Sequence, residues 1–184
     1  GDPSFISPFQ ILNCSEISIS NSVFDGDIAS GTGTAADGFG YGKGLVVSGS
    51  SGIDIVGNEF FDWIRGATFD NSSGLSIIDN NIHDIRSDGL DFVQVTSVLI
   101  ESNYLHDFVT SPTTGDHADF IQFWTNGSEA PSTNVVIRSN TLDTGSGGMV
   151  QAIFMRNEAV DIEGADLTMY YKNILIEENV ILGA

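Results

Sequence analysis

The sequence is poor in positive charge, with 6 Lys and Arg residues against 25 Asp and Glu residues among 184, for a net charge of −19. Nucleic acid is excluded as a partner because its binding needs clustered cations that neutralise phosphates. An anionic membrane surface is excluded as a partner for the same reason. So acidic a chain instead favours solubility and the binding of divalent cations.

Cysteine and long apolar segments are also scarce. Cys14 is the single cysteine, so no disulfide can form within the chain, and the sequence fits no zinc-binding pattern. No apolar run approaches the length of a membrane span, and no signal peptide opens the sequence. Both ends fall inside a periodic pattern, which predicts one domain, residues 1–184, that belongs to a longer solenoid with flanking segments.

What the sequence has in quantity is a short repeat, apolar-x-Ile-x-x-Asn-x-apolar, as in "LSIIDNNI" at 75–82 and "VLIESNYL" at 98–105. The shortest intervals between copies are 22 and 23 residues, and the longer ones, of 36 to 39 residues, contain inserted loops. Alternating Ile and Leu predict strands, and clusters of Gly, Ser, Asn and Asp predict turns. The recurring polar position comprises Ser22, Asn58, Asn80, Asn103, Asn140 and Asn179.

This repeat resembles that of the right-handed parallel β-helix, and the resemblance spans essentially the whole chain. No single coil can bury its apolar face, whereas coils stacked about 4.8 Å apart form a continuous core. An Asn at each inward turn can bond its own coil and the amides of neighbouring Asn side chains. We therefore predict an all-β fold, a right-handed parallel β-helix of about six coils with inserted loops. The alternative, an antiparallel sandwich, predicts short hairpin turns and no recurring Asn.

An acidic motif, D-x-x-D-F-[V/I]-Q, occurs twice, at 88–94 and at 116–122. Local similarity predicts that Asp91 and Asp119 share one outward column of adjacent coils, roughly 5 Å apart. When carboxylates lie so close together, the pKa of at least one of them rises, or the group binds a cation. A protonated acid beside an ionised one suits glycoside hydrolysis, and the oxygens of Asp91 and Asp119 suit Ca²⁺ as a cofactor. The structural alternative is that these Asp residues only form solvated turns. The predicted catalytic residues are Asp88, Asp91, Asp116, His117 and Asp119.

The coils also resemble those of polygalacturonase-type glycoside hydrolases, whose successive coils carry N-T-D, G-D-D and G-H-G. The corresponding segments here read "RSDG", "GDH" and "GGM". Asp88 and Asp116 match two of the acids, whereas His117 and Met149 replace an Asp and a His. The resemblance thus implies a β-helix that acts on polysaccharide, with a different set of reacting groups.

Mannuronan C5-epimerases and alginate lyases share the β-helix and use acidic residues and His with tyrosine and basic residues. Their G-x-D-P-H-E falls on "GLDFVQ", in which Gly89 and Asp91 agree. Removal of a proton beside a uronate carboxylate needs a base, a cation and a proton donor. The candidates that this resemblance implies are His117 for the base, Arg156 or Arg65 for the cation, and Tyr104 or Tyr41 for the donor.

Residues around the acidic motifs complete the predicted binding site. Trp124 shares a column with Arg156 just past the strand, where an indole suits stacking on a sugar and a guanidinium suits a substrate carboxylate. Inserted loops on one side of a solenoid are where binding usually occurs, so we expect them to wall a groove. The loops are 30–44, 110–117, 126–133 and 157–172. The predicted substrate-binding residues are Arg156, Trp124, Gln94, Gln122, Arg65 and Lys43.

A second outward column contains His83 and His106, each followed by Asp and three residues after a recurring Asn. Its place on another face of the coil predicts a surface His–Asp ladder, with a metal site as the alternative.

Together these patterns predict an extracellular or surface-associated protein that cleaves or epimerises an acidic polysaccharide. The alternatives are a non-catalytic β-helix, such as a trimeric virion fibre or a glycan-binding adhesin, and a Ca²⁺-stabilised structural module. The enzyme predicts an open groove with His117 within reach of Asp88 or Asp91. The fibre predicts acidic columns that are scattered by loops or buried under a partner chain.

Overall fold

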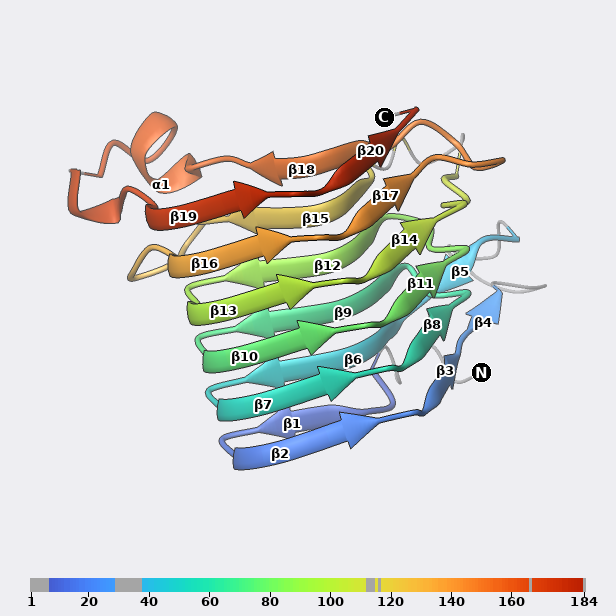
Figure 1. Cartoon of the computed structure of the whole chain (residues 1–184). Helices are drawn as coiled ribbons and strands as arrows, with labels where there is room; N and C mark the ends of the chain where they lie inside the picture. The colour runs from blue at the N-terminus through green and yellow to red at the C-terminus, as the bar shows by residue number, and fades with distance from the viewer. Residues whose placement is uncertain (1–6, 29–37, 112–114, 116, 166, 184) are drawn as a thin grey trace.

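The computed structural model describes residues 7–28, 38–111, 115, 117–165 and 167–183. The strands stack in coils, and three parallel sheets of six strands each run along the stack (Figure 1). The chain climbs from the N-terminal coil to the C-terminal coil with a right-handed turn (Figure 1). The predicted right-handed parallel β-helix of six coils is therefore confirmed.

Each coil contributes one strand to each sheet. Sheet A comprises β1 (Gln10–Leu12), β6 (Lys43–Ser48), β9 (Arg65–Asp70), β12 (Asp88–Val93), β15 (Asp119–Trp124) and β18 (Gln151–Met155). Sheet B comprises β2 (Ser15–Ser20), β7 (Ser51–Val56), β10 (Ser73–Ile78), β13 (Thr96–Glu101), β16 (Thr133–Arg138) and β19 (Lys172–Glu177). Sheet C comprises β3 (Val23–Asp25), β8 (Glu59–Phe61), β11 (Asn81–His83), β14 (Tyr104–His106), β17 (Thr141–Asp143) and β20 (Val180–Leu182).

The remaining elements are short and lie outside the three sheets. An antiparallel pair, β4 (Asp27–Ile28) with β5 (Gly40–Tyr41), precedes the second coil. Helix α1 (Glu158–Asp161) and a 3-10 turn (Leu167–Met169) interrupt the last coil between β18 and β19. Within the described ranges, no helix has the length and apolar character needed to span a membrane.

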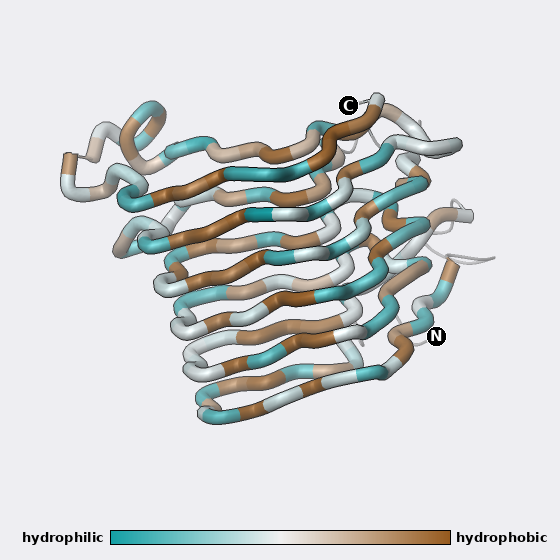
Figure 2. The backbone as a smooth tube through the Cα atoms, viewed as in Figure 1, coloured by the Kyte–Doolittle hydropathy of each residue, from teal (hydrophilic) through white to brown (hydrophobic). Residues whose placement is uncertain are grey.

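The core is made of apolar columns that run from coil to coil, and Figure 2 shows apolar residues recurring at the same place in successive coils. Phe69, Phe92 and Phe123 form one such column, with ring centroids 4.9 and 4.7 Å apart. Burial of each such side chain contributes about 1.5–3 kcal/mol. In sheet B the inward columns are Ile53, Leu75, Val98 and Val135, and Ile55, Ile77, Ile100 and Ile137.

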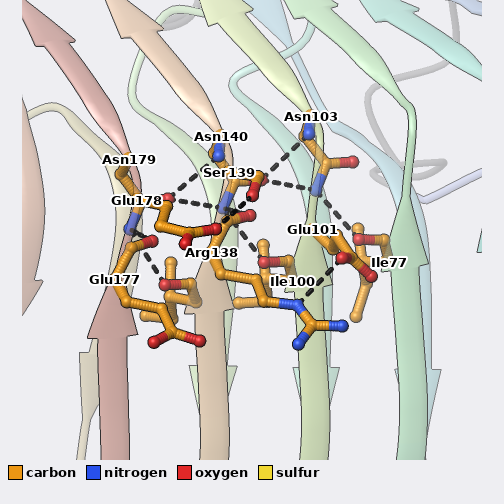
Figure 3. Close-up of polar contacts among 11 residues, drawn as sticks. Ile77, Ile100, Glu101, Asn103, Arg138, Ser139, Asn140, Glu177, Glu178 and Asn179 are labelled. Carbon is orange, nitrogen blue, oxygen red and sulfur yellow. Dashed lines mark hydrogen bonds and ion pairs between the residues drawn. The ribbon is translucent and has the colours of Figure 1, made fainter.

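The recurring Asn residues form a buried ladder at the turn between sheets B and C. Asn103 is typical: its Oδ1 accepts bonds from the backbone N–H and the Nδ2 of Asn80, both at 2.9 Å. Its own Nδ2 donates to the carbonyl oxygen of Ile77 at 2.8 Å. Figure 3 shows the same pattern continuing through Asn140 to Asn179. The predicted column is confirmed, and it satisfies backbone groups that no strand could reach.

The predicted pairing of the two acidic motifs is wrong by three residues. Leu90 of β12 pairs with Ile121 of β15, and Asp91 pairs with Gln122. Asp119 therefore stands opposite Asp88 rather than Asp91, and it pairs with Gln151 on its other side. The two copies of the motif lie in adjacent coils but out of register.

Apolar packing explains this register. In the observed pairing Phe123 stacks on Phe92, which extends the column that begins at Phe69. Phe120 takes the inward place opposite Gly89 and packs edge-on against Phe108, with ring centroids 4.6 Å apart. Phe120 and Phe123 are fully buried, so their packing stabilises the observed register. The similarity in sequence of the two acidic motifs contributes no packing energy.

The predicted His–Asp ladder is confirmed on the outer face of sheet C. The rings of His83 and His106 stack at 5.1 Å, and each Nδ1 lies 2.6 Å from the carboxylate of the Asp that follows it. Tyr104 stacks on His106 at 3.9 Å. Tyr104, one of the two predicted proton donors, therefore lies on a different sheet from the acidic motifs.

Candidate functional site

The acidic residues share the outer face of sheet A because its strands are locally irregular. A Cβ added to Gly89 would meet the carbonyl oxygen of Phe120 at 2.7 Å and core side chains just beyond, so Gly89 faces inward. The next residue, Leu90, is also buried in the core. Because Gly89 and Leu90 both face inward, the residues on either side of them, Asp88 and Asp91, lie on the same outer face of the sheet. The tight approach at this position requires glycine.

Arg65 lies between the first two carboxylates. Its Nε is 2.8 Å from Asp88 Oδ2 and 3.3 Å from Asp91 Oδ2, although both carboxylates are almost fully buried. Lys43 is the cross-strand neighbour of Arg65 in the coil below. Two of the few cations of this chain are therefore held directly beside its buried acids, which compensates part of their charge.

Asp91 is the buried acid that reaches the surface groove. Burial raises its pKa to about 6, while Arg65 opposes the shift and Asp88 adds to it. The indole Nε1 of Trp124 donates to Asp91 Oδ1 at 2.7 Å. Burial also lowers the pKa of Lys43, and the neighbouring Arg65 lowers it further. Asp91 can therefore take up or release a proton near neutral pH.

His117 and Asp119 form a base-like pair at the start of β15. His117 Nδ1 lies 3.0 Å from Asp119 Oδ2, and the same oxygen accepts a bond from Gln122 Nε2 at 2.9 Å. The side chain of Asp119 is 0% exposed, whereas that of His117 is 52% exposed. Burial raises the pKa of Asp119 to about 6, with His117 opposing the shift. A proton on Nδ1 leaves the lone pair of Nε2 as the basic atom of the ring.

Two adjoining hollows, of about 400 and 460 Å³, lie over this face of sheet A. Glu158 of α1 belongs to one wall, and its Oε2 accepts a bond from the backbone N–H of Thr125 at 2.9 Å. The inserted loops at 126–133 and 157–172 therefore both contribute to a groove, as predicted. Lys43, Asp91, Trp124 and Asn126 line both hollows, and Arg65, Gln122 and Glu158 complete the second.

Of the remaining predicted residues that the structure describes, Gln94 lines one of the two hollows, whereas Arg156 and His117 line neither. Gln94 lines the rim of the groove, where its Oε1 accepts bonds from the backbone N–H groups of Glu129 and Ala130 and so holds the loop that forms the wall. Arg156 follows β18 beside the Trp124 column and pairs with Asp161 at 2.9 Å. His117 contacts Asp119, rather than the Asp88 or Asp91 that was expected. Asp116 and much of the loops at 30–44 and 110–117 lie outside the described residues.

Asn126, Glu158 and Thr68 line the groove without having been predicted individually. The first two lie in loops that the sequence marked as insertions, which was the available signal. Thr68 is the cross-strand partner of Asp91 in the coil below. In the sequence it looks like an ordinary strand residue, so nothing marked it as part of the site.

The two predicted calcium ligands, Asp91 and Asp119, stand in different columns. Donors from Trp124 and Arg65 occupy both oxygens of Asp91, and Gln122 donates to Oδ2 of Asp119. Among the residues that the structure describes, no three His, Cys, Asp or Glu side chains gather as metal ligands. Binding of Ca²⁺ therefore stays a prediction.

The raised pKa of Asp91 predicts an unusual pH dependence of stability. Between its ordinary value of 3.8 and about 6, the folded state binds more protons at this residue than the unfolded state. The contribution of Asp91 to the unfolding free energy therefore falls as pH rises through this window and levels off above it, by about 1–3 kcal/mol in all. Urea unfolding of the wild type and Asp91→Asn at pH 4, 5, 6 and 7 measures the effect. If the unfolding free energies of the two proteins changed with pH in parallel, the prediction would be contradicted.

No family model matches the sequence, and no curated protein sequence matches it. Among solved structures, the periplasmic alginate epimerase AlgG is 11% identical with a TM-score of 0.50, over 95% of this chain and 47% of that one. An alginate lyase from Paenibacillus sp. str. FPU-7 is 14% identical with a TM-score of 0.42, over 91% of this chain and 63% of that one. This chain thus spans less than two thirds of either protein. The likeness to the epimerase confirms the parallel β-helix fold.

Proposed function

We propose that this chain is part of a polysaccharide-active enzyme that removes the proton beside the carboxylate of a uronate in an acidic glycan, as a lyase or a C5-epimerase. The observation that carries the proposal is the exposed His117 with Nδ1 held 3.0 Å from the buried Asp119, on the face that also presents Arg65 and Lys43. The periplasmic epimerase whose structure this chain resembles is named for alginate, a uronate polymer. We place the protein outside the cytoplasm because its substrate is a polymer.

His117 is the proposed base. Asp119 fixes the ring through Nδ1, so Nε2 can take the proton from C5 of the uronate. The electrons of the broken C–H bond move into the substrate carboxylate, whose added negative charge needs cations nearby. Arg65 and Lys43 supply these cations, and the indole of Trp124 at the groove supplies an apolar surface for a sugar ring.

The fate of the resulting anion separates the two reactions. In a lyase the electrons return to form a double bond between C4 and C5, and the bond from C4 to the glycosidic oxygen breaks, with a proton delivered to that oxygen. In an epimerase a proton returns to C5 from the opposite face and no glycosidic bond breaks. Tyr41, two residues before Lys43, is the candidate proton donor that does not lie on sheet C.

Glycoside hydrolysis is the second candidate, and Asp91 is the observation that favours it. A buried carboxyl with a pKa of about 6 in a groove is suited to protonating a glycosidic oxygen. Hydrolysis differs from elimination in its product, because it yields a new reducing end without a double bond.

The test is incubation of the protein with alginate, pectate, hyaluronan and neutral glycans, with and without Ca²⁺. Ultraviolet absorbance detects unsaturated uronates, a reducing-end assay detects every cut, and proton NMR of the recovered polymer detects epimerisation. We expect change in a uronate polymer alone, as unsaturated ends or as altered C5 stereochemistry, and its loss in Asp119→Asn. Reducing ends without unsaturation would favour the hydrolase. An unchanged polymer in every assay would contradict catalysis and favour the fibre or adhesin.

A further inference from the structure

Two buried carboxylate oxygens of the site lack a hydrogen-bond partner among the described residues: Asp88 Oδ1 and Asp119 Oδ1. The residues are 1% and 0% exposed, so bulk water does not solvate these atoms. An ionised oxygen buried without a donor is destabilising by several kcal/mol. Both atoms therefore need a hydrogen that no described side chain or backbone group supplies.

The two carboxyl groups are neighbours across the strands. The pairing of Leu90 with Ile121 places Asp88 opposite Asp119, in strands about 4.8 Å apart. The Ser87 side chain and the Asp119 backbone N–H lower the pKa of Asp88, against the larger effect of burial, so both groups lie beside its carboxylate. The remaining oxygens are engaged elsewhere, since Asp88 Oδ2 contacts Arg65 and Asp119 Oδ2 contacts His117 and Gln122.

We propose that Asp88 and Asp119 share one proton, which bridges Asp88 Oδ1 and Asp119 Oδ1, and that Asp88 thereby acts as a positioning residue for the Asp119–His117 pair. A proton on either oxygen donates to the other, so a single proton satisfies both atoms. The bridge holds Asp119 with Oδ2 directed at His117 Nδ1. This role rests on the proposed function, in which His117 is the base.

Charge balance supports the shared proton. Among the described residues, the charged or titratable groups that face the pair are Arg65 from β9, Asp91 from β12 and His117, with Lys43 of β6 beyond Arg65, while β18 presents the neutral Gln151. With one proton on the pair and His117 neutral, the two cations match the two remaining negative charges. Burial, the largest influence on each residue, raises the pKa of both Asp88 and Asp119, which is the direction that retention of a proton requires.

Infrared spectroscopy of the folded protein at pH 7, without substrate, tests the shared proton. We expect the C=O stretch of a protonated carboxylic acid in the wild type and its loss in both Asp88→Asn and Asp119→Asn, because the new amide donates to the remaining carboxylate. Asp91→Asn removes the third buried acid and is the matched control, in which the band should persist. A wild type without the band, a band that survives either pair variant, or a band lost in Asp91→Asn would overturn the proposal.

Carboxyl ¹³C NMR of the wild type provides a second measurement that depends on no variant. Two carboxyls that share a proton titrate together, so the signals of Asp88 and Asp119 should both move at each step of the titration. Movement of one signal alone at its own pH would overturn the sharing. Neither measurement requires turnover, so an inactive protein with the band would contradict the proposed function and leave the shared proton standing.

Discussion

Replacement of Asn103 by alanine is expected to lower the unfolding free energy by about 3–5 kcal/mol, because it interrupts the buried ladder at its centre. The variant loses the Oδ1 that accepts from the backbone N–H of Asn80 and the Nδ2 that donates to Ile77. Asn103 is 1% exposed, so water cannot replace these partners. Each buried group left without a partner accounts for about 1–3 kcal/mol, and the space of the lost amide adds to it. Urea unfolding followed by circular dichroism measures the change.

Asn81→Ala is the matched control, since it removes the same side chain from the position next to the ladder, on the outer face of sheet C. Its Nδ2 donates to Glu59 Oε1 at 3.3 Å and its Oδ1 lies 3.0 Å from His106 Nε2, but the residue is partly exposed. Water can satisfy the groups that it leaves, so we expect a loss of only about 1 kcal/mol. Equal losses in the two variants would show that burial does not determine the contribution of these side chains.

Replacement of His117 by glutamine is expected to lower kcat/KM on the uronate polymer by about 10²–10⁴-fold, the usual contribution of a positioned general base. Glutamine can still donate to Asp119, whose Oδ2 lies 3.0 Å from His117 Nδ1, but it cannot take up a proton at the position of Nε2. Because the side chain of His117 is 52% exposed, the unfolding free energy should change little. Initial rates from the assay that detects the product, with circular dichroism of each protein, measure both effects.

His106→Gln provides a matched control for this experiment. His106 also holds an Asp through Nδ1, at 2.6 Å, but it lies on the outer face of sheet C. Its substitution should therefore leave kcat/KM unchanged within about twofold, as expected for a residue that contacts neither substrate nor reacting atoms. Comparable losses in the two variants would trace the effect of His117→Gln to the fold rather than to a base.

The architecture could be predicted from the sequence because each coil repeats the same physical requirement. An inward Ile at alternate positions and an Asn at the turn recur wherever a coil must bury its face and satisfy its backbone, as Ile77 and Asn80 do for one coil and Ile100 and Asn103 for the next. Where two coils follow each other without a long insertion, counting from the Asn also gives the correct partners. Arg65 and Asp88, for example, each stand 15 residues before the Asn of their coil, and the structure pairs them.

The count fails where a loop intervenes between the strand and its Asn. Counting back from Asn140 by the number of residues that separates Asp91 from Asn103 leads into the loop after β15. The similarity of the two acidic motifs was then the remaining guide to the pairing of the strands. That similarity pointed to Asp91 as the partner of Asp119, whereas the packing of Phe123 on Phe92 places Asp119 opposite Asp88. This register is determined by contacts between residues that are about 30 positions apart in the sequence. The sequence of one strand alone contains no information about those contacts.

The sequence by itself therefore determined the fold, the Asn ladder, the acidic face and the inclusion of His117 in it, because these follow from periodicities within single coils. Only the tertiary structure decided which acids meet, that Arg65 lies between Asp88 and Asp91, and that His117 is held by Asp119. It also decided which residues of the predicted loops, Asn126 and Glu158 among them, line the groove. The reason is physical: a column is set by side-chain packing between coils, and the lengths of the intervening loops do not constrain it.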